Sequence, residues 1–198
     1  MANTVFADIL KAGRTSMHQP GFVDSRDWFR QKASEVRSVN PQKIIQSSYE
    51  QQRSNILPGF MYMFTYDAKY KDTLPYYDRF PLIFPFSMQS DHFMGLNMHY
   101  LPLIYRARLM DALYNLTTNQ RFDEKTRLRL SYDLLNSSAK YKYFEPCVKK
   151  YLKSHVKSRF LLIPSNEWDI ALFLPLERFN TNKVNVFQDS MRKIQRIT

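Results

Sequence analysis

Residues 59–102 carry the feature that most limits the fold of this chain, namely short runs of bulky aromatic and apolar side chains that prolines interrupt. The run Phe60–Tyr66 places bulky side chains on both faces of a strand, which predicts a strand covered on both sides or curled into a barrel. Phe80–Phe86 predicts a second strand, and its prolines predict a sheet edge or bulges. Phe93–Met98 predicts a third strand. The stretch therefore predicts a small, rigid β core, whose expected scaffold side chains are Tyr62, Phe64, Phe80, Ile83 and Phe84.

Three helical patterns follow this stretch. Pro102 opens a helix that continues to about Leu116 and places its apolar side chains along one stripe. A second helix begins at Asp123. Pro146 opens a third, which reaches about Val156. These helices are expected to pack beside the β core.

Two later apolar runs, Arg159–Ile163 and Ile170–Leu174, surround a turn and predict strands that complete the sheet. The expected fold is therefore α+β. We expect a small, bent antiparallel sheet or an SH3-like barrel from residues 58–100 and 158–176, with flanking helices from 102–157 and extended N- and C-terminal arms.

The expected arms are a helical N-terminal segment, residues 1–57, and a basic C-terminal tail, residues 180–198, on either side of a core domain at 58–179. Each has a thin apolar stripe at helical spacing, and such segments gain stability by docking on another surface. We therefore expect Trp28, Phe29, Phe187 and Met191 to bind partner chains.

The charge of the chain indicates a polyanionic partner. The 198 residues carry a formal net charge of +11, which attracts nucleic acid, anionic lipid or an acidic protein surface. A single cysteine, Cys147, excludes an internal disulfide and zinc sites built from several thiolates. We expect no secretory signal at the N-terminus and no apolar run long enough to span a bilayer.

Catalytic motifs are absent from the sequence, which contains no phosphate-binding glycine-rich loop, no G-x-S-x-G elbow and no H-E-x-x-H pair. The four histidines come from different predicted elements, and Cys147 with His155 is a weak candidate for a nucleophilic pair. Loop aspartates, Asp67 and Asp78 among them, leave a metal-dependent nuclease as a minor alternative. We expect a protein that is not an enzyme and that has no cofactor and no metal site.

A basic cluster surrounds the third predicted helix. Lys149, Lys153 and Lys157 recur every four residues, so they would line one helix face, and tyrosines interleave with lysines just upstream. Such a face is typical of phosphate contacts combined with stacking. The candidate nucleic-acid-binding residues are Lys140, Lys142, Lys149, Lys150, Lys153, Lys157 and Arg159.

Several phrases of the core carry a family resemblance. The residues 64–84 (FTYDAKYKDTLPYYDRFPLIF), 95–102 (GLNMHYLP), 106–113 (RARLMDAL) and 121–126 (RFDEKT), with Ser158-Arg-Phe, resemble virion structural proteins of T-even-like contractile-tailed bacteriophages. The likeness covers roughly residues 58–179. Among these virion proteins, the quoted residues most resemble the DNA end protectors, which are head-completion proteins.

This resemblance implies a protein of the virion, synthesised in the host cytoplasm, that binds or protects packaged DNA ends at the head–neck or portal region. Its expected partners are portal, neck or tail subunits in a symmetric oligomeric assembly, together with double-stranded DNA. The alternative is a purely structural tail or baseplate subunit, which holds neighbouring chains through its terminal arms.

Overall fold

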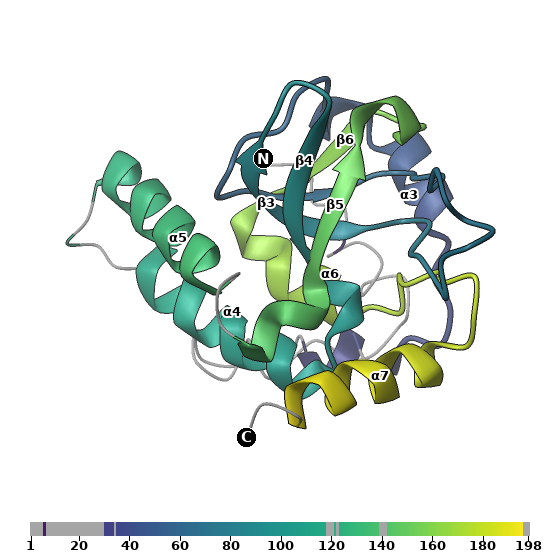
Figure 1. Ribbon diagram of the computed structural model, residues 1–198. Helices are drawn as coiled ribbons and strands as arrows, with labels where there is room; N and C mark the ends of the chain where they lie inside the picture. Colours follow the sequence, from purple (N-terminus) through teal and green to yellow (C-terminus); the bar gives the residue numbers. More distant parts are fainter. Residues whose placement is uncertain are drawn as a thin grey trace.

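The centre of the fold is a six-stranded antiparallel sheet with the order β1-β6-β2-β3-β4-β5 (Figure 1). A computed structural model describes residues 6, 30–33, 35–117, 121, 123–138 and 142–195. The strands are β1 Gln52–Arg53, β2 Met61–Met63, β3 Leu82–Met88, β4 His92–Asn97, β5 Val148–Leu152 and β6 Phe160–Ile163. The α+β class and the antiparallel sheet with flanking helices are confirmed.

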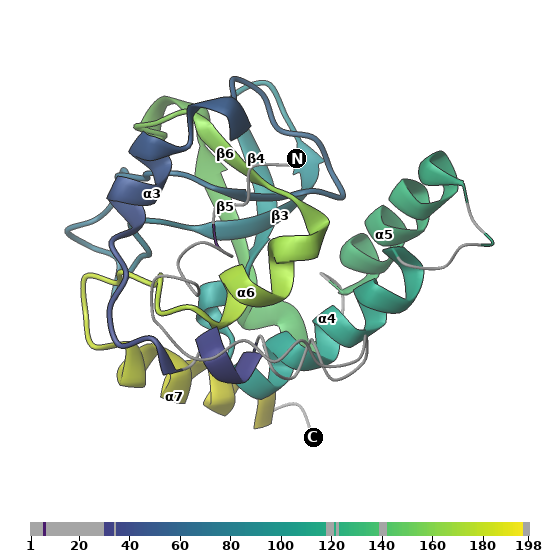
Figure 2. The ribbon, with the colours of Figure 1, turned by 180° about the vertical axis from the view of Figure 1, so that it is seen from behind.

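Helices surround this sheet (Figures 1 and 2). They are α3 Pro41–Ser47, α4 Leu103–Thr117, α5 Glu124–Ser138, α6 Trp168–Phe173 and α7 Lys183–Gln195. Short 3-10 turns occupy Tyr49–Gln51, Met98–Tyr100, Lys142–Cys147, Lys153–His155 and Ser165–Glu167. Helices α4 and α5 form a hairpin that extends to one side of the sheet, while α7 crosses the end opposite α3 and β6. Within the described residues, no helix is long and apolar enough to cross a membrane.

The sheet is strongly bent but open. A bulge between Pro85 and Ser87 shifts the register of β3 against β4, as the prolines of that strand predict. Beyond β5 the chain turns a corner, and the Lys157 amide donates to the Thr65 carbonyl at 2.8 Å, next to an isolated bridge between Tyr66 and Val156. The end of β2 is thereby joined to the segment between β5 and β6. The strand order still has two edges, so the structure has the bent sheet and not the closed barrel that the sequence left open.

Two sequence predictions are wrong. Pro146 does not open a helix, because residues Val148–Leu152 pair with β4 from Leu96 to His92 and form the strand β5. Ile170–Leu174 is not a strand, because α6 covers residues Trp168–Phe173 and the Trp168 indole donates to the Ile163 carbonyl at 2.9 Å. Ile170–Leu174 is a short apolar run, which fits a buried strand or a buried helix equally well. The spacing of Val148–Leu152 suits a helix, and pairing with β4 made it a strand.

Apolar side chains are buried on both faces of the sheet. On one face, Leu82, Phe84 and Trp168 belong to a core shared with the helices, and the Phe84 and Trp168 rings meet edge-on at 4.9 Å. On the other face, Phe64 is fully buried and meets four aromatic rings edge-on at 5.2–6.2 Å, those of Tyr66, Phe93, Tyr151 and Phe160. The predicted strand Phe60–Tyr66 is shorter in the structure, where β2 spans Met61–Met63. Met61 and Met63 are buried in the core shared with the helices and Tyr62 in the other, so β2 is covered on both sides as predicted.

The described parts of both chain ends pack on this core. The Phe6 side chain is fully buried and its amide donates to Glu167 Oε1 at 3.1 Å, while Ile44 and Ile45 of α3 join the helix-side core. Helix α7 buries Val186, Ser190 and Ile194, so the C-terminal amphipathic pattern is a docked helix up to Gln195. The boundaries of the three segments 1–57, 58–179 and 180–198 stay a prediction.

Candidate nucleic-acid interface

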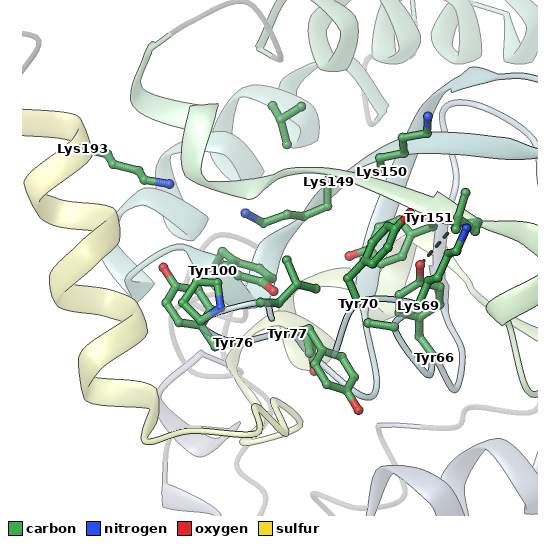
Figure 3. Close-up of a pocket in the computed structure, with 16 residues that line it drawn as sticks. Tyr66, Lys69, Tyr70, Tyr76, Tyr77, Tyr100, Lys149, Lys150, Tyr151 and Lys193 are labelled. Atoms are coloured by element: carbon green, nitrogen blue, oxygen red, sulfur yellow. Dashed lines mark hydrogen bonds between the residues drawn. The ribbon is translucent and has the colours of Figure 1, made fainter. Parts of the chain in front are cut away.

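Strand β5 lies at an edge of the sheet and carries lysines beside a pocket of about 540 Å³. The pocket is walled by β5, by the loop between β2 and β3, by Tyr100 after β4 and by one side chain of α7 (Figure 3). Its tyrosines are Tyr66, Tyr70, Tyr76, Tyr77, Tyr100 and Tyr151, and its lysines are Lys69, Lys149, Lys150 and Lys193. We call it the tyrosine–lysine pocket.

The cations of this pocket outnumber its acids. Lys149 and Lys193 extend toward each other from β5 and α7, above the rings of Tyr76 and Tyr100 (Figure 3). Lys149 Nζ lies 4.1 Å from the centroid of the Tyr100 ring, a cation–π contact. The lining residues contain one carboxylate, Asp78, whose side chain is buried and engaged elsewhere. The pocket therefore presents a positive field.

Among the residues that the structure describes, Lys149 is a partly buried cation without an ion-pair partner. Its ammonium makes no hydrogen bond or ion pair with the residues that the structure describes, and its close contact is the Tyr100 ring. Burial, followed by the charge of Lys193, lowers the pKa of Lys149 from 10.5 to about 8. A negative charge placed between the two lysines would offset both effects, because an opposite charge nearby favours the charged form of Lys149. Lys149 and Lys193 are therefore suited to bind an anion between them.

Tyrosine rings provide the apolar part of the wall. Tyr70 is 59% exposed, so part of its ring is accessible, and Lys69 Nζ lies 5.2 Å from the ring centroid. Tyr76 is half-buried and its ring lies 6.0 Å from that of Tyr100. Burial, with Asp189 nearby, raises the pKa of Tyr76 to about 12, so its hydroxyl stays neutral at physiological pH. Neutral tyrosine faces beside lysines suit both stacking and phosphate contacts.

A buried polar network fixes the floor of the pocket. Asp78 Oδ2 accepts from Asn97 Nδ2 at 3.1 Å and from His99 Nδ1 at 2.7 Å, and Asp78 Oδ1 accepts from the Phe80 and Arg178 amides. Asn97 Nδ2 also donates to the Tyr151 hydroxyl at 3.0 Å. Burial alone would raise the pKa of the Asp78 carboxyl, but His99 and these donors hold that pKa below its usual value. Asp78 is thus a structural carboxylate.

The structure brings together only part of the predicted basic cluster. Lys149 and Lys150 line the pocket, while Lys153, Lys157 and Arg159 are exposed at the corner between β5 and β6. Lys153 Nζ donates to the Gln89 carbonyl at 2.6 Å. Because Lys149 lies on a strand, the predicted single helix face through 149, 153 and 157 does not exist. Lys142 begins a 3-10 turn, and Lys140 lies outside the described residues.

Sequence reasoning missed half of the pocket. Lys69 and Lys193 come from a loop and from α7, and the exposed ring of Tyr70 and the paired tyrosines Tyr76 and Tyr77 come from that same loop. The concentration of tyrosines and lysines in residues 66–77 was the available signal. Tyr62, Phe64, Phe80, Ile83 and Phe84, by contrast, are all buried, which confirms them as scaffold.

The alternative catalytic candidates are engaged in structural contacts. Cys147 is fully buried, donates through Sγ to the Phe144 carbonyl at 2.9 Å, and has its pKa raised by burial to about 12. His155 lies beyond the opposite end of β5 and contacts the Asp67 carbonyl through Nδ1 at 2.8 Å. No group of three side chains able to hold a metal ion occurs within the described ranges.

Two of the four predicted partner-binding residues lie in the described part of the chain. Phe187 and Met191 line a groove of about 450 Å³ on the outer face of α7, together with Pro102 and Val184. The Arg106 guanidinium packs on the Phe187 ring, with 5.7 Å between Cζ and the ring centroid. Trp28 and Phe29 lie outside the described residues.

Comparison with known proteins gives one family. The family model described as "Phage T4 terminal DNA protecting protein" matches residues 20–194, which include the whole sheet, the tyrosine–lysine pocket and α7 up to Ile194. No curated protein and no solved structure matches the chain.

Proposed function

Because the chain belongs to the family of the phage T4 terminal DNA protecting protein, we propose that it binds the ends of linear duplex DNA and shields them from exonucleases. Protection is steric, since a protein that occupies a DNA end denies the nuclease its substrate. The chain then needs no catalytic group of its own. This agrees with the engagement of Asp78 and Cys147 in structural contacts.

The observation that supports DNA binding is the basic surface formed by β5 and the corner that follows it. Lys150, Lys157 and Arg159 are exposed there, next to the lysines of the tyrosine–lysine pocket. Each lysine or arginine that contacts a phosphate releases counterions, so binding is sequence-independent and weakens steeply as salt rises. The pocket and the corner together form a binding surface that can cover the end of a duplex.

We place this activity in the virion, on packaged DNA at the head–neck or portal region, after synthesis in the host cytoplasm. The protein then works beside portal, neck or tail subunits in a symmetric assembly. The support is the family membership together with the net charge of +11, which suits a position against the DNA.

An exonuclease protection assay tests the proposal. A linear duplex is incubated with the protein and a processive exonuclease over a range of salt. An excess of closed circular duplex, which has no ends, competes for protein that only coats DNA. We expect the linear duplex to survive at low salt and to be digested as salt rises. Unprotected linear DNA at low salt would refute end protection.

A pair of matched variants assigns the surface. The double variant Lys157→Gln/Arg159→Gln removes two charges from the corner, while Arg37→Gln/Lys43→Gln removes two exposed charges at and beside α3. The first should weaken DNA binding and lower its salt slope by about 2, and the second should leave both unchanged. Equal effects of the two variants would mean that only the overall charge matters.

The groove on α7 favours a second candidate, a structural subunit that docks a neighbouring virion chain. Val184 is 51% exposed, and Leu103 and Ile104 at the start of α4 are also exposed. Apolar side chains gathered around a groove mark a contact for another chain. The lysines and arginines of α7 favour a partner with an apolar ridge between acidic side chains.

Val184→Lys separates the two candidates. A structural subunit with this substitution should fail to enter assembled particles while it still protects DNA ends in solution. Normal incorporation into particles would remove the second candidate.

A further inference from the structure

We propose that the tyrosine–lysine pocket holds the 5′-terminal nucleotide of a DNA strand, with its phosphate between Lys149 and Lys193 and its base against the exposed tyrosines. This inference rests on the proposed function, because it names the part of the DNA end that the protein recognises. The pocket would recognise the 5′ terminus of the DNA strand, whereas the basic corner between β5 and β6 attracts DNA of any sequence.

The two lysines define the phosphate position. They extend toward one another from β5 and α7, and no carboxylate of the described residues pairs with Lys149 (Figure 3). Two like charges across a gap repel each other, and Lys193 indeed contributes to the lowered pKa of Lys149. An anion between them relieves this repulsion. A terminal 5′-phosphate carries close to two charges at neutral pH, whereas an internal phosphodiester carries one, so the pair favours the terminus.

The tyrosines define the base position. Tyr70, Tyr76 and Tyr77 line the pocket, and Tyr70 is exposed while Tyr76 and Tyr77 are half-buried. Every base has an aromatic face, so stacking on tyrosine tolerates any sequence. That tolerance fits a protein that must accept whatever nucleotide ends the DNA. The apolar wall and the cationic pair thus match the two parts of one nucleotide.

The volume of the pocket limits it to one nucleotide. A volume of about 540 Å³ falls within the range of pockets that enclose small molecules and is too small for a base pair with its two backbones. Asp78 and Tyr151 line the pocket and are buried, and hydrogen bonds through Asn97 hold both side chains in the core, so this part of the wall is protein interior. An internal nucleotide would have to leave the duplex against pairing and stacking on both sides, while a terminal one frays at lower cost. A pocket of this size therefore favours a terminal nucleotide over an internal one.

Binding to duplexes that differ only at the terminus tests the proposal. Three probes are compared by fluorescence anisotropy with the full-length protein: a hairpin duplex with one 5′-phosphorylated blunt end, the same hairpin with a 5′-hydroxyl, and a dumbbell closed at both ends. We expect the 5′-phosphate to bind about tenfold more tightly than the 5′-hydroxyl, as for the loss of one charge-assisted contact. Lys149→Met should abolish this preference, and Lys157→Gln should weaken all three probes equally and keep it.

The outcomes separate this inference from the proposed function. If both open hairpins bind equally and more tightly than the dumbbell, the protein binds ends but the pocket does not read the 5′-phosphate. If all three probes bind equally, end binding itself is wrong. If Lys149→Met does not fold, Lys193→Gln on the exposed face of α7 provides the same comparison. A 5′-phosphate preference that survives in Lys193→Gln would overturn the assignment of the phosphate site.

Discussion

Arg106 and Lys149 are two cations withdrawn from water in different ways. Arg106 is fully buried, and its guanidinium donates to the carbonyls of Leu101, Leu172 and His99 at 2.7, 2.7 and 3.1 Å, with Glu177 Oε1 at 3.8 Å. Lys149 has a tyrosine ring at 4.1 Å and a second lysine across a gap, but no hydrogen-bond acceptor among the described residues. The fold provides hydrogen-bond acceptors for Arg106, but none among the described residues for Lys149.

This difference separates a structural charge from one that is available to a ligand. Burial of a charge is tolerated where acceptors surround it, as for Arg106, which joins α4 to the residues before it and to the end of α6. A partly buried charge without acceptors opposes folding and persists where a ligand supplies the missing partner. The following predictions test that distinction.

Removal of the structural cation should have the largest effect. Arg106→Met leaves three buried carbonyls without their donor and Glu177 without its nearest cation in the core. We expect a loss of about 3–5 kcal/mol in the free energy of unfolding. Urea unfolding followed by circular dichroism measures it. A variant as stable as the natural protein would show that the carbonyls find other donors and that the contrast with Lys149 is unfounded.

Asp78→Asn should have the next largest effect, because an amide cannot accept all four hydrogen bonds of the carboxylate. We expect a loss of about 2–3 kcal/mol at neutral pH. Since the folded-state pKa of Asp78 lies below its unfolded value, this stabilisation is present above about pH 4 and is lost as the pH falls through the folded-state pKa. The stability gap between the two proteins should therefore narrow in acid, and a gap independent of pH would contradict the role of the charge.

Lys149→Met should change stability in the opposite direction. The folded-state pKa of about 8 lies below the ordinary value of 10.5, so the charged side chain favours the unfolded state at neutral pH. We expect the variant to gain about 1–2 kcal/mol at pH 7 and to lose affinity for DNA ends. The gain should shrink as the pH rises from 8 toward 10.5, where the natural lysine becomes neutral in both states.

The groups that face Lys149 are Lys193 on α7, Tyr100 after β4, and Glu145 and Cys147 before β5. Cys147 has a raised pKa, so its own contribution to stability falls above about pH 9 as the unfolded thiol ionises. Both proteins share Cys147, and the difference between their unfolding curves at each pH removes its effect. A variant that is less stable than the natural protein at pH 7 would make Lys149 a structural residue like Arg106.

The smallest effect on stability is expected for Tyr70→Ala. The ring is 59% exposed, so its loss should change the free energy of unfolding by less than about 0.5 kcal/mol. Loss of one stacking face should weaken binding of a 5′-phosphorylated end about fivefold. Tyr49→Ala is the matched control, because Tyr49 is 76% exposed and does not line the pocket. Equal binding by the two variants would exclude Tyr70 from the site.

The sequence by itself determined the β core, the two helices of the α4–α5 hairpin and the basic character of the region after residue 146. The run Phe60–Tyr66 has bulky side chains at nearly every position, which favours a strand covered on both sides, and Met61–Met63 form such a strand. The sequence also placed Lys149 and Lys150 in a basic cluster, because the number of lysines and the lack of nearby acids are properties of composition. Both lysines line the pocket, and their role in DNA binding stays a prediction.

Tertiary structure decided what those lysines do. Val148–Leu152 has a spacing that suits a helix, and only pairing with β4 made it an edge strand that turns Lys149 toward α7. Lys193 is 44 positions away from Lys149 in the sequence. Tyr76 precedes β3, and Tyr100 follows β4. A pocket depends on which distant segments the bent sheet and α7 bring together, and local periodicity carries no information about that. The sequence shows the positive charge of this region, but only the tertiary structure determines which residues form the tyrosine–lysine pocket.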